Sequence, residues 1–171
     1  MNCRPAVQLI TEELIDLVVA EARQSSRRRS NYNFHAGGED NPQRFLNVVL
    51  QGSYVRPHRH LTPPKAESFL LLNGHAVAFV FDDDGVVVCG HVLGPDAFAG
   101  KIPSRVTDET VARGIDLQPG LWHSIAALTP VAVCYEVKPG PWNPATDKEF
   151  APWAPEEGSP SAAPYLVALL R

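Results

Sequence analysis

The sequence predicts an all-β fold, a sandwich or small barrel of short strands, preceded by one helix. Beyond residue 45, apolar and polar residues alternate in runs of a few residues, and turn residues separate these runs. No helical pattern intervenes between them. The 171 residues include 16 prolines and 12 glycines, which argues against a helical bundle and for many short elements joined by turns.

The single helix is expected to begin after Thr11, a residue type that caps helix N-termini. Leu14, Leu17 and Val18 share one face of this helix, and Ala22 follows one turn later. Acidic residues occupy its first turns and a basic residue lies near its end, as the helix dipole favours. We therefore expect this face to pack against the β-structure.

Eight segments have the alternation of strands, and Asn73-Gly74 and Asp84-Gly85 are hairpin signals between them. The predicted strands are Phe45–Leu50, Ser53–His60, Glu67–Leu72, Ala76–Phe81, Val86–Val92, Gly114–Leu117, His123–Leu128 and Val131–Val137. This number of short strands is typical of a sandwich or small barrel.

The composition changes at residue 139. Residues 139–171 contain seven prolines together with Trp142, Phe150, Trp153 and Tyr165. Prolines with few aromatics would indicate disorder, whereas these aromatic residues indicate a tail that wraps around the β-structure and buries itself there. We therefore divide the chain into an N-terminal helix and arm (1–46), a β-domain (47–138) and a C-terminal extension (139–171).

The charge and composition exclude several function classes. A net charge of −4 provides no basic field for nucleic acid or an anionic membrane, and no apolar run approaches the length of a membrane span. The basic run at residues 27–29 is either an anion patch or a solvated helix exit. Cys3, Cys89 and Cys134 are scattered without CxxC spacing, which suits a reducing cytosol. We expect a cytoplasmic protein that binds neither nucleic acid nor membrane.

Four residues have the spacing of a candidate metal-binding site. His58 and His60 are two positions apart, so on a strand both side chains leave the same face. Glu67 opens the next predicted strand, where an antiparallel return places it opposite the two histidines, and His123 begins a later strand. Three imidazoles and one carboxylate suit Zn, Fe, Mn, Ni or Cu. The competing interpretation is a pair of histidines on a solvated strand face.

These residues resemble the two cupin motifs. The first is represented by Gly52, His58, His60, Glu67 and Gly74, and the second by Gly120 and His123. Longer blocks are similar to the WbuC-type cupin-fold metalloproteins. They are RSNYNFH at 29–35, PQRFLN at 42–47, YVRPHRH at 54–60, PPKAE at 63–67, PGLWHS at 119–124, EVKPGPW at 136–142 and TDKEFAPWAPEEG at 146–158.

The resemblance implies a cupin barrel, that is, a double-stranded β-helix or jelly roll, with a Pro/Trp-rich C-terminal extension. It implies His58, His60, Glu67 and His123 as ligands of one divalent transition metal, Zn, Fe, Mn or Ni. Members of the family are associated with bacterial O-antigen and exopolysaccharide loci, and cupins commonly form homodimers through their sheets. We therefore expect a metal-binding cupin that acts on or binds a small sugar-derived or carboxylated molecule.

Five other residues are candidates for substrate binding. Strand parity places Tyr54 and Arg56 on the face of His58 and His60. An inward arginine is costly unless it meets an anion, so Arg56 either binds a substrate carboxylate or phosphate or forms an ion pair with a buried acid such as Glu136.

The remaining three candidates lie around the expected mouth of the site. Tyr32 and His35 either form a lid or only attach the arm to the surface, and Lys65 is expected at the rim. No residue is assigned a catalytic role. An enzyme, a non-catalytic binding or sensing protein, an Fe-dependent dioxygenase and a purely structural metal site all fit the sequence.

Overall fold

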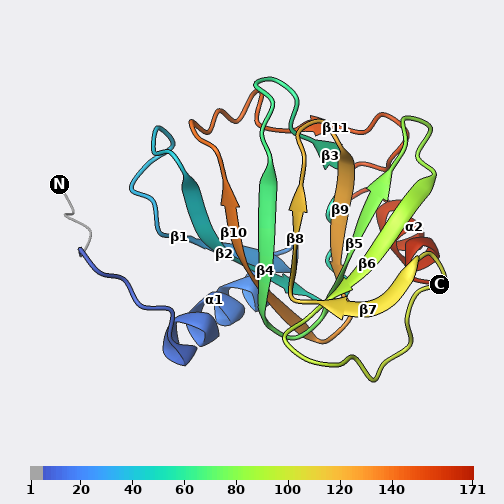
Figure 1. Ribbon diagram of the computed structural model, residues 1–171, viewed down its shortest axis with the longest axis horizontal. Coiled ribbons are helices and arrows are strands. Elements are labelled where there is room, and N and C mark those ends of the chain that lie inside the picture. Colours follow the sequence, from blue (N-terminus) through green and yellow to red (C-terminus); the bar gives the residue numbers. More distant parts are fainter. Residues whose placement is uncertain (1–5) are drawn as a thin grey trace.

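The computed structural model describes residues 6–171; Cys3 lies outside them. The described chain is mostly β, with one helix near each end (Figure 1). The helices are α1 (Glu12–Gln24) and α2 (Ala162–Leu169). The strands are β1 (Arg29–Asn33), β2 (Gln43–Leu50), β3 (His58–Arg59), β4 (Glu67–Asn73), β5 (Ala76–Phe81), β6 (Val87–Leu93), β7 (Asp108–Ala112), β8 (Gly114–Leu117), β9 (Trp122–Ala127), β10 (Val131–Lys138) and β11 (Glu149–Phe150).

The strands form two sheets, in the orders β1-β2-β10-β4-β8 and β11-β3-β9-β5-β6-β7. Except for the parallel pair β6–β7, the strand pairs of the described chain are antiparallel. Without the edge strands β1, β7 and β11, the order is β2-β10-β4-β8 against β3-β9-β5-β6. This is the arrangement of a jelly roll, the architecture of cupins. The cupin-like fold expected from the sequence is confirmed at this level.

The main core lies between the two sheets, and each helix closes a second core on an outer face. Strands β5 and β9 are buried at all six positions each. Their inward residues, such as Ala78 and Ile125, join the core between the sheets, whereas Phe79 and Phe81 lie under Leu166 of α2. A strand covered on both faces is expected to be apolar throughout, as β5 is.

Helix α1 packs against the outer face of β2 and β10, with the Thr11 hydroxyl accepting from Leu14 N as its cap. The buried face consists of Ile15, Val18, Val19 and Ala22. The buried face of the helix therefore differs from the predicted one. Leu17 is 53% exposed, because the sheet lies against the side of the helix that carries Ile15 and Val19. No helix of the described chain is long and apolar enough to cross a membrane.

The second predicted strand was too long. Of the predicted strand 53–60, only His58 and Arg59 pair in a sheet. Pro57 has no N–H to donate, and the preceding backbone is satisfied by other partners. Arg56 N donates to the Glu157 carboxylate, and Val55 O accepts from the Ser124 hydroxyl. Strands β1, β7 and β11 and helix α2 were not predicted.

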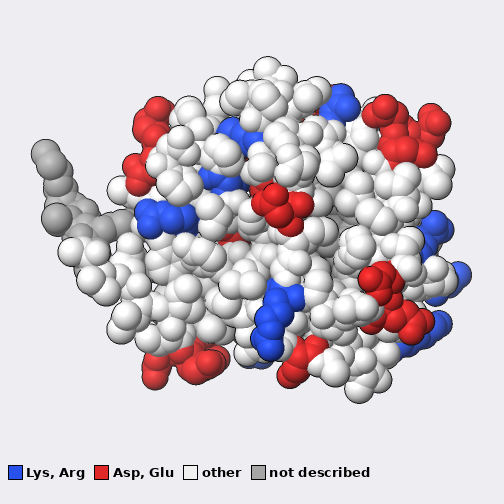
Figure 2. Space-filling model, in the orientation of Figure 1, with Lys and Arg blue, Asp and Glu red and all other residues white. Residues whose placement is uncertain are grey.

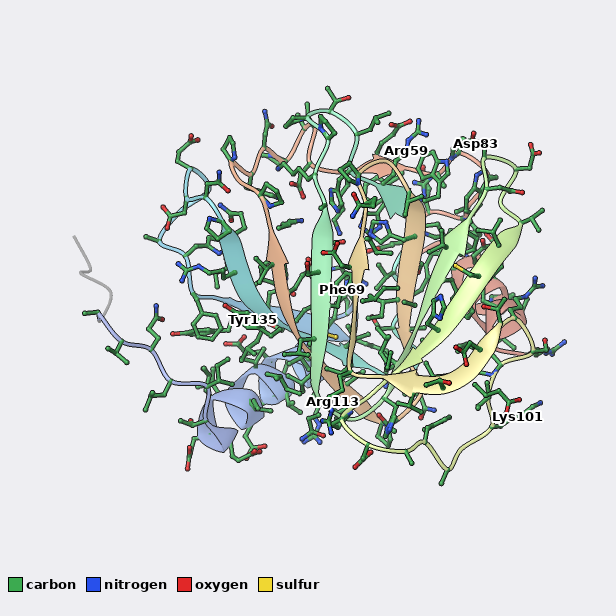
Figure 3. All side chains as sticks on the ribbon, viewed as in Figure 1. Arg59, Phe69, Asp83, Lys101, Arg113 and Tyr135 are labelled. Atoms are coloured by element: carbon green, nitrogen blue, oxygen red, sulfur yellow. The ribbon has the colours of Figure 1, made fainter. Side chains whose placement is uncertain are left out.

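The C-terminal residues contact the β-structure at several points. Strand β11 pairs with β3, and Ala151 N donates to Pro57 O beyond it. Arg59 of β3 forms ion pairs with Glu149 of β11, at 2.7 Å, and with Asp83, at 3.6 Å. Arg59 and Asp83 lie at the same end of the molecule as β11 (Figure 3). This end of the two sheets is therefore lined by C-terminal residues.

We predict that Gly74→Ala lowers the free energy of unfolding by about 3 kcal/mol, the upper range for a strained non-glycine residue. Gly74 has a φ of 67°, and a Cβ there would overlap the Val131 carbonyl. Gly37→Ala is the control, because a Cβ there meets nothing within 4 Å, and it should change stability by less than about 0.5 kcal/mol. Denaturant unfolding measures both; equal effects would contradict the assigned turn geometry.

Candidate metal centre

Four buried side chains meet between the sheets, at the end near β11. One ligand atom from each of His58, His60, Glu67 and His123 can be chosen so that all lie within 4.8 Å of one another. The register explains the meeting. His58 of β3 is directly opposite His123 of β9, His60 follows β3, and Glu67 is the first residue of β4. The structure thus brings together the four side chains that the sequence suggested.

Backbone carbonyls orient all three imidazole rings. His58 Nδ1 lies 2.9 Å from Arg56 O, and His123 Nδ1 lies 2.9 Å from Leu121 O. His60 Nδ1 contacts the carbonyl of Asp147. Because a carbonyl only accepts hydrogen bonds, each Nδ1 carries a proton and each ring turns its Nε2 toward the cluster.

This arrangement fits a cation. The Nε2 atoms of His58 and His60 are buried without a hydrogen-bond partner among the described residues. His123 Nε2 lies 2.9 Å from Glu67 Oε2, so two acceptors face each other. A proton or a metal ion between these atoms removes the conflict, and a metal ion also satisfies the two unpartnered nitrogens. The four residues therefore suit a divalent transition metal; its identity is not determined by this donor set.

The ionisation states favour the same conclusion. Burial, with Lys148 and His123 nearby, holds the pKa of His58 well below its ordinary value, so the ring is neutral at pH 7. Burial alone would raise the pKa of Glu67, but the nearby imidazoles of His123 and His60 outweigh burial and hold that pKa well below its usual range. The site thus presents a neutral His58 imidazole and the Glu67 carboxylate, the forms that bind metal.

A second carboxyl group adjoins the cluster. Burial, followed by the charge of Glu67, raises the pKa of Glu136 well above its usual range, which favours the protonated form. Asn47 Nδ2 donates to Glu136 Oε2 at 2.9 Å. Arg56 makes no ion pair with Glu136 in the described chain; its guanidinium donates to Ala151 O at 3.0 Å. The suggested Arg56–Glu136 pair is therefore wrong.

A buried ion-pair network supports the cluster from the C-terminal side. The Asp147 carboxylate lies 2.9 Å from both Lys65 Nζ and Lys138 Nζ, and Lys65 also donates to Pro141 O at 2.7 Å. Lys138 Nζ is 3.7 Å from Glu67 Oε1. Lys65 is only 3% exposed, so its expected place at the rim was wrong. This network fixes the residue whose carbonyl orients His60.

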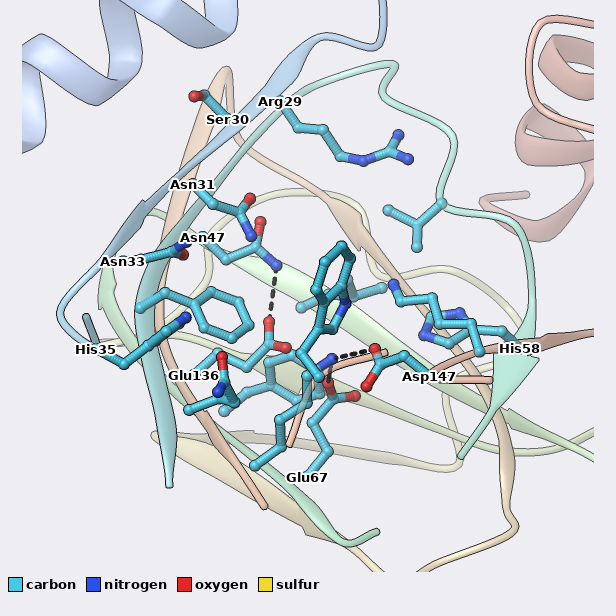
Figure 4. Close-up of a pocket in the computed structure, with 18 of the residues that line it drawn as sticks. Arg29, Ser30, Asn31, Asn33, His35, Asn47, His58, Glu67, Glu136 and Asp147 are labelled. Carbon is cyan, nitrogen blue, oxygen red and sulfur yellow. Dashed lines mark hydrogen bonds and ion pairs between the residues drawn. The ribbon is translucent and has the colours of Figure 1, made fainter. Parts of the chain in front are cut away.

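A cavity of about 690 Å³ opens onto the cluster, which lines it through His58, Glu67 and His123. Figure 4 shows Asn31, Asn33 and Asn47 on one side of this cavity and His58 on the other. A second cavity of about 220 Å³ shares His58, Asp147 and other residues with the first. The volumes and polar walls suit a small hydrophilic molecule.

The five candidate substrate residues are divided between different places. His35 lines the large cavity and Arg56 lines the small one. Tyr32 donates to Gln8 and packs beside α1, and Tyr54 donates to Pro155 O and packs against Tyr165. Strand alternation predicted that Tyr54 shares the face of His58 and His60, but residues 53–57 are not in a strand and the alternation does not apply to them.

The sequence interpretation missed several residues of the site. Lys138 and Asn47 line the large cavity, and Asp147 and Lys148 line both cavities. A signal existed for Lys138, because Glu136 and Lys138 alternate with apolar residues on a buried strand. No periodic signal marks Asp147 and Lys148, which precede β11 in the proline-rich tail.

The comparisons with known proteins agree with this architecture. A model of a domain of unknown function, DUF6016, matches residues 10–93. No similar sequence was found among the curated proteins.

Among solved structures, the capsular polysaccharide assembling protein CapF from Staphylococcus aureus is similar, with a TM-score of 0.54 and 20% identity over 74% of this chain and 32% of CapF. Protein SO0799 from Shewanella oneidensis gives a TM-score of 0.51 and 10% identity over 70% of this chain and 72% of that protein. The chain thus spans about a third of the length of CapF. Such identities show a shared fold alone.

We predict that Asp147→Asn lowers the free energy of unfolding by about 3–5 kcal/mol, because it leaves Lys65 buried without a counter-charge and Lys138 with only Glu67, 3.7 Å away. Glu149→Gln is the control: it breaks the more exposed ion pair with Arg59, which is worth less than about 1 kcal/mol. Denaturant unfolding of both variants tests this difference. Similar small losses in the two would show that the buried network contributes little.

Proposed function

We propose that this protein binds one divalent transition metal ion at His58, His60, Glu67 and His123. We propose further that it binds a small sugar-derived or carboxylated molecule in the adjoining cavity. The observation that carries the proposal is the pair of buried, unpartnered Nε2 atoms on His58 and His60, beside a carboxylate that faces a third Nε2. Such a site is costly unless a cation occupies it.

The bound ion would supply a Lewis acid for a substrate oxygen. The chain's own groups then position the molecule. Asn47 Oδ1 is buried without a partner among the described residues and can accept from a hydroxyl group. The pKa of Glu136 is raised beside Glu67 and Glu136 lines the same cavity, so its carboxyl group in the protonated form can donate to a substrate oxygen. These groups favour an enzyme over a purely structural metal site.

The biological setting we propose is bacterial surface-polysaccharide metabolism. CapF, which shares the fold, is a capsular polysaccharide assembling protein, and the WbuC-type resemblance points to polysaccharide loci. The polar cavity walls agree with a hydroxylated ligand. Cys89 and Cys134 are free thiols, which agrees with the proposed cytoplasmic location, and a homodimer remains a prediction from the resemblance.

Elemental analysis of untagged protein tests the metal site. We predict one transition metal ion per chain, retained in His91→Ala, a histidine outside the cluster, and lost in the His58→Ala/His60→Ala double variant. The metal identity would direct the search for the reaction, because Fe favours oxygen chemistry and Zn favours Lewis-acid chemistry. Absence of metal after reconstitution with Fe, Mn, Ni and Zn would overturn the proposal.

Catalysis and binding are separated by a second measurement. Metal-loaded protein is incubated with uronic acids and sugar phosphates, and the mixtures are followed by NMR. We predict conversion that depends on the metal and falls at least tenfold in Glu136→Gln, which keeps the shape of the carboxyl group but cannot deliver its proton. Saturable binding without conversion would instead support the non-catalytic binding protein.

A further inference from the structure

The smaller cavity beside the metal cluster is lined by an excess of cationic side chains. Arg27, Arg29, Arg56 and Lys148 line it, against Asp147 and Glu157. This concentration contrasts with the whole chain, whose net charge is −4. Acidic and basic side chains are interspersed over the face seen in Figure 2. A local excess of cations in a concave site focuses the electrostatic potential and attracts anions.

The two acidic groups are already neutralised by other partners. Arg29 Nη2 lies 2.6 Å from both carboxylate oxygens of Glu157, which also accepts from Arg56 N. Asp147 lies between Lys65 and Lys138. The acidic residues of this cavity therefore do not compensate the remaining cations.

Three cations remain without a carboxylate partner. Arg27, Arg56 and Lys148 form no ion pair with any residue in the described part of the chain. Arg56 is restrained by a hydrogen bond to Ala151 O and by the Phe150 ring, 5.3 Å from its guanidinium carbon. Its Nε is buried and has no hydrogen-bond partner among the described residues. A buried guanidinium donor without an acceptor indicates that a ligand provides one.

We propose that the small cavity is an oxyanion subsite in which Arg27, Arg56 and Lys148 bind a phosphoryl or carboxylate group of the ligand. The inference rests on the proposed function, because it assigns this anionic group to the molecule whose other end reaches the metal centre. His58 lines both cavities and therefore connects the two parts of the site.

The residues that line the two cavities set the orientation of the bound ligand. Its charged group lies among the arginines and Lys148, its neutral body lies along Asn31 and Asn47, and an oxygen at the far side faces Glu67 and His123. The Arg29–Glu157 pair contributes a fixed wall, since Arg29 Nη2 contacts both Glu157 oxygens and Arg29 Nη1 donates to Tyr54 O. A neutral sugar could use only the asparagine wall, so the substrate class is an acidic or phosphorylated saccharide.

Inorganic phosphate is the probe for this subsite, titrated at constant ionic strength and followed by phosphorus NMR. We expect saturable binding that weakens about tenfold in Arg27→Ala and in Lys148→Ala, as for the loss of one charge-assisted hydrogen bond. Arg23→Ala and Lys101→Ala are matched controls, because neither residue lines the cavity, and both should bind phosphate as the unaltered protein does. Equal affinities in all four variants, or no saturable binding, would overturn the subsite.

The same titration on metal-loaded and metal-free protein separates this inference from the proposed function. Phosphate binding that needs Arg27 and Lys148 in both forms supports the subsite, even if elemental analysis finds no native metal. Binding that occurs only with metal, and that the two substitutions leave unchanged, overturns the subsite while the metal site stands.

Comparing the affinities of three sugars, glucose 1-phosphate, glucuronate and glucose, shows whether the subsite binds a phosphoryl or a carboxylate group. We expect at least one charged sugar to bind about tenfold more tightly than glucose, with this preference lost in Lys148→Ala. A preference for glucose 1-phosphate assigns the phosphoryl group, and one for glucuronate assigns the carboxylate. Equal affinity for all three sugars would contradict the proposal.

Discussion

The metal centre depends on three hydrogen bonds in which backbone carbonyls hold the histidine rings. Two of these carbonyls are local: Arg56 precedes His58 by two residues, and Leu121 precedes His123 by two. The third, on Asp147, is distant in sequence from His60. Since each ring can coordinate only with its Nε2 turned inward, the geometry of the centre requires that the segment around residue 147 be in place.

The C-terminal residues are therefore part of the site. Asp147 reaches His60 because its carboxylate lies between Lys65 and Lys138, and β11 then continues the sheet beside β3. Trp153, six residues beyond Asp147, packs against Phe81 and Trp122 on the outer face. A chain that lost these anchors would lose the third carbonyl and one wall of both cavities. Folding of the extension and formation of the centre are thus coupled.

The sequence revealed the ligands and most strands because both have a local signature. Period-two burial marks β4, and a short apolar run marks β5, which is buried on both faces. The two histidines of the HxH pair both reach the cluster, as predicted, because His58 is paired in a strand. Strand alternation does not place Tyr54 on the face of the two histidines, because the chain at Tyr54 contacts C-terminal residues and is not paired with a neighbouring strand. Asp147 and Lys148 could not be predicted because proline-rich segments have no period, and their partners come from tertiary packing.

Charges of opposite sign are concentrated in different parts of the site: Glu67 and Glu136 line only the large cavity, and Arg56 lines only the small one. The acidic groups, Glu67 and Glu136, lie together at the cluster, where the charge of Glu67 contributes to the raised pKa of Glu136 and the nearby imidazoles lower the pKa of Glu67. Of the unpaired cations, Arg56 lines only the smaller cavity, whereas Arg27 and Lys148 line both cavities. The carboxyl groups by themselves would repel an anionic ligand, whereas the cations attract it. A cation bound at the cluster would offset the carboxylate charge and allow the other oxygens of the ligand to approach. Metal binding and ligand orientation are linked through this separation of charge, since the histidines contribute no charge of their own when neutral.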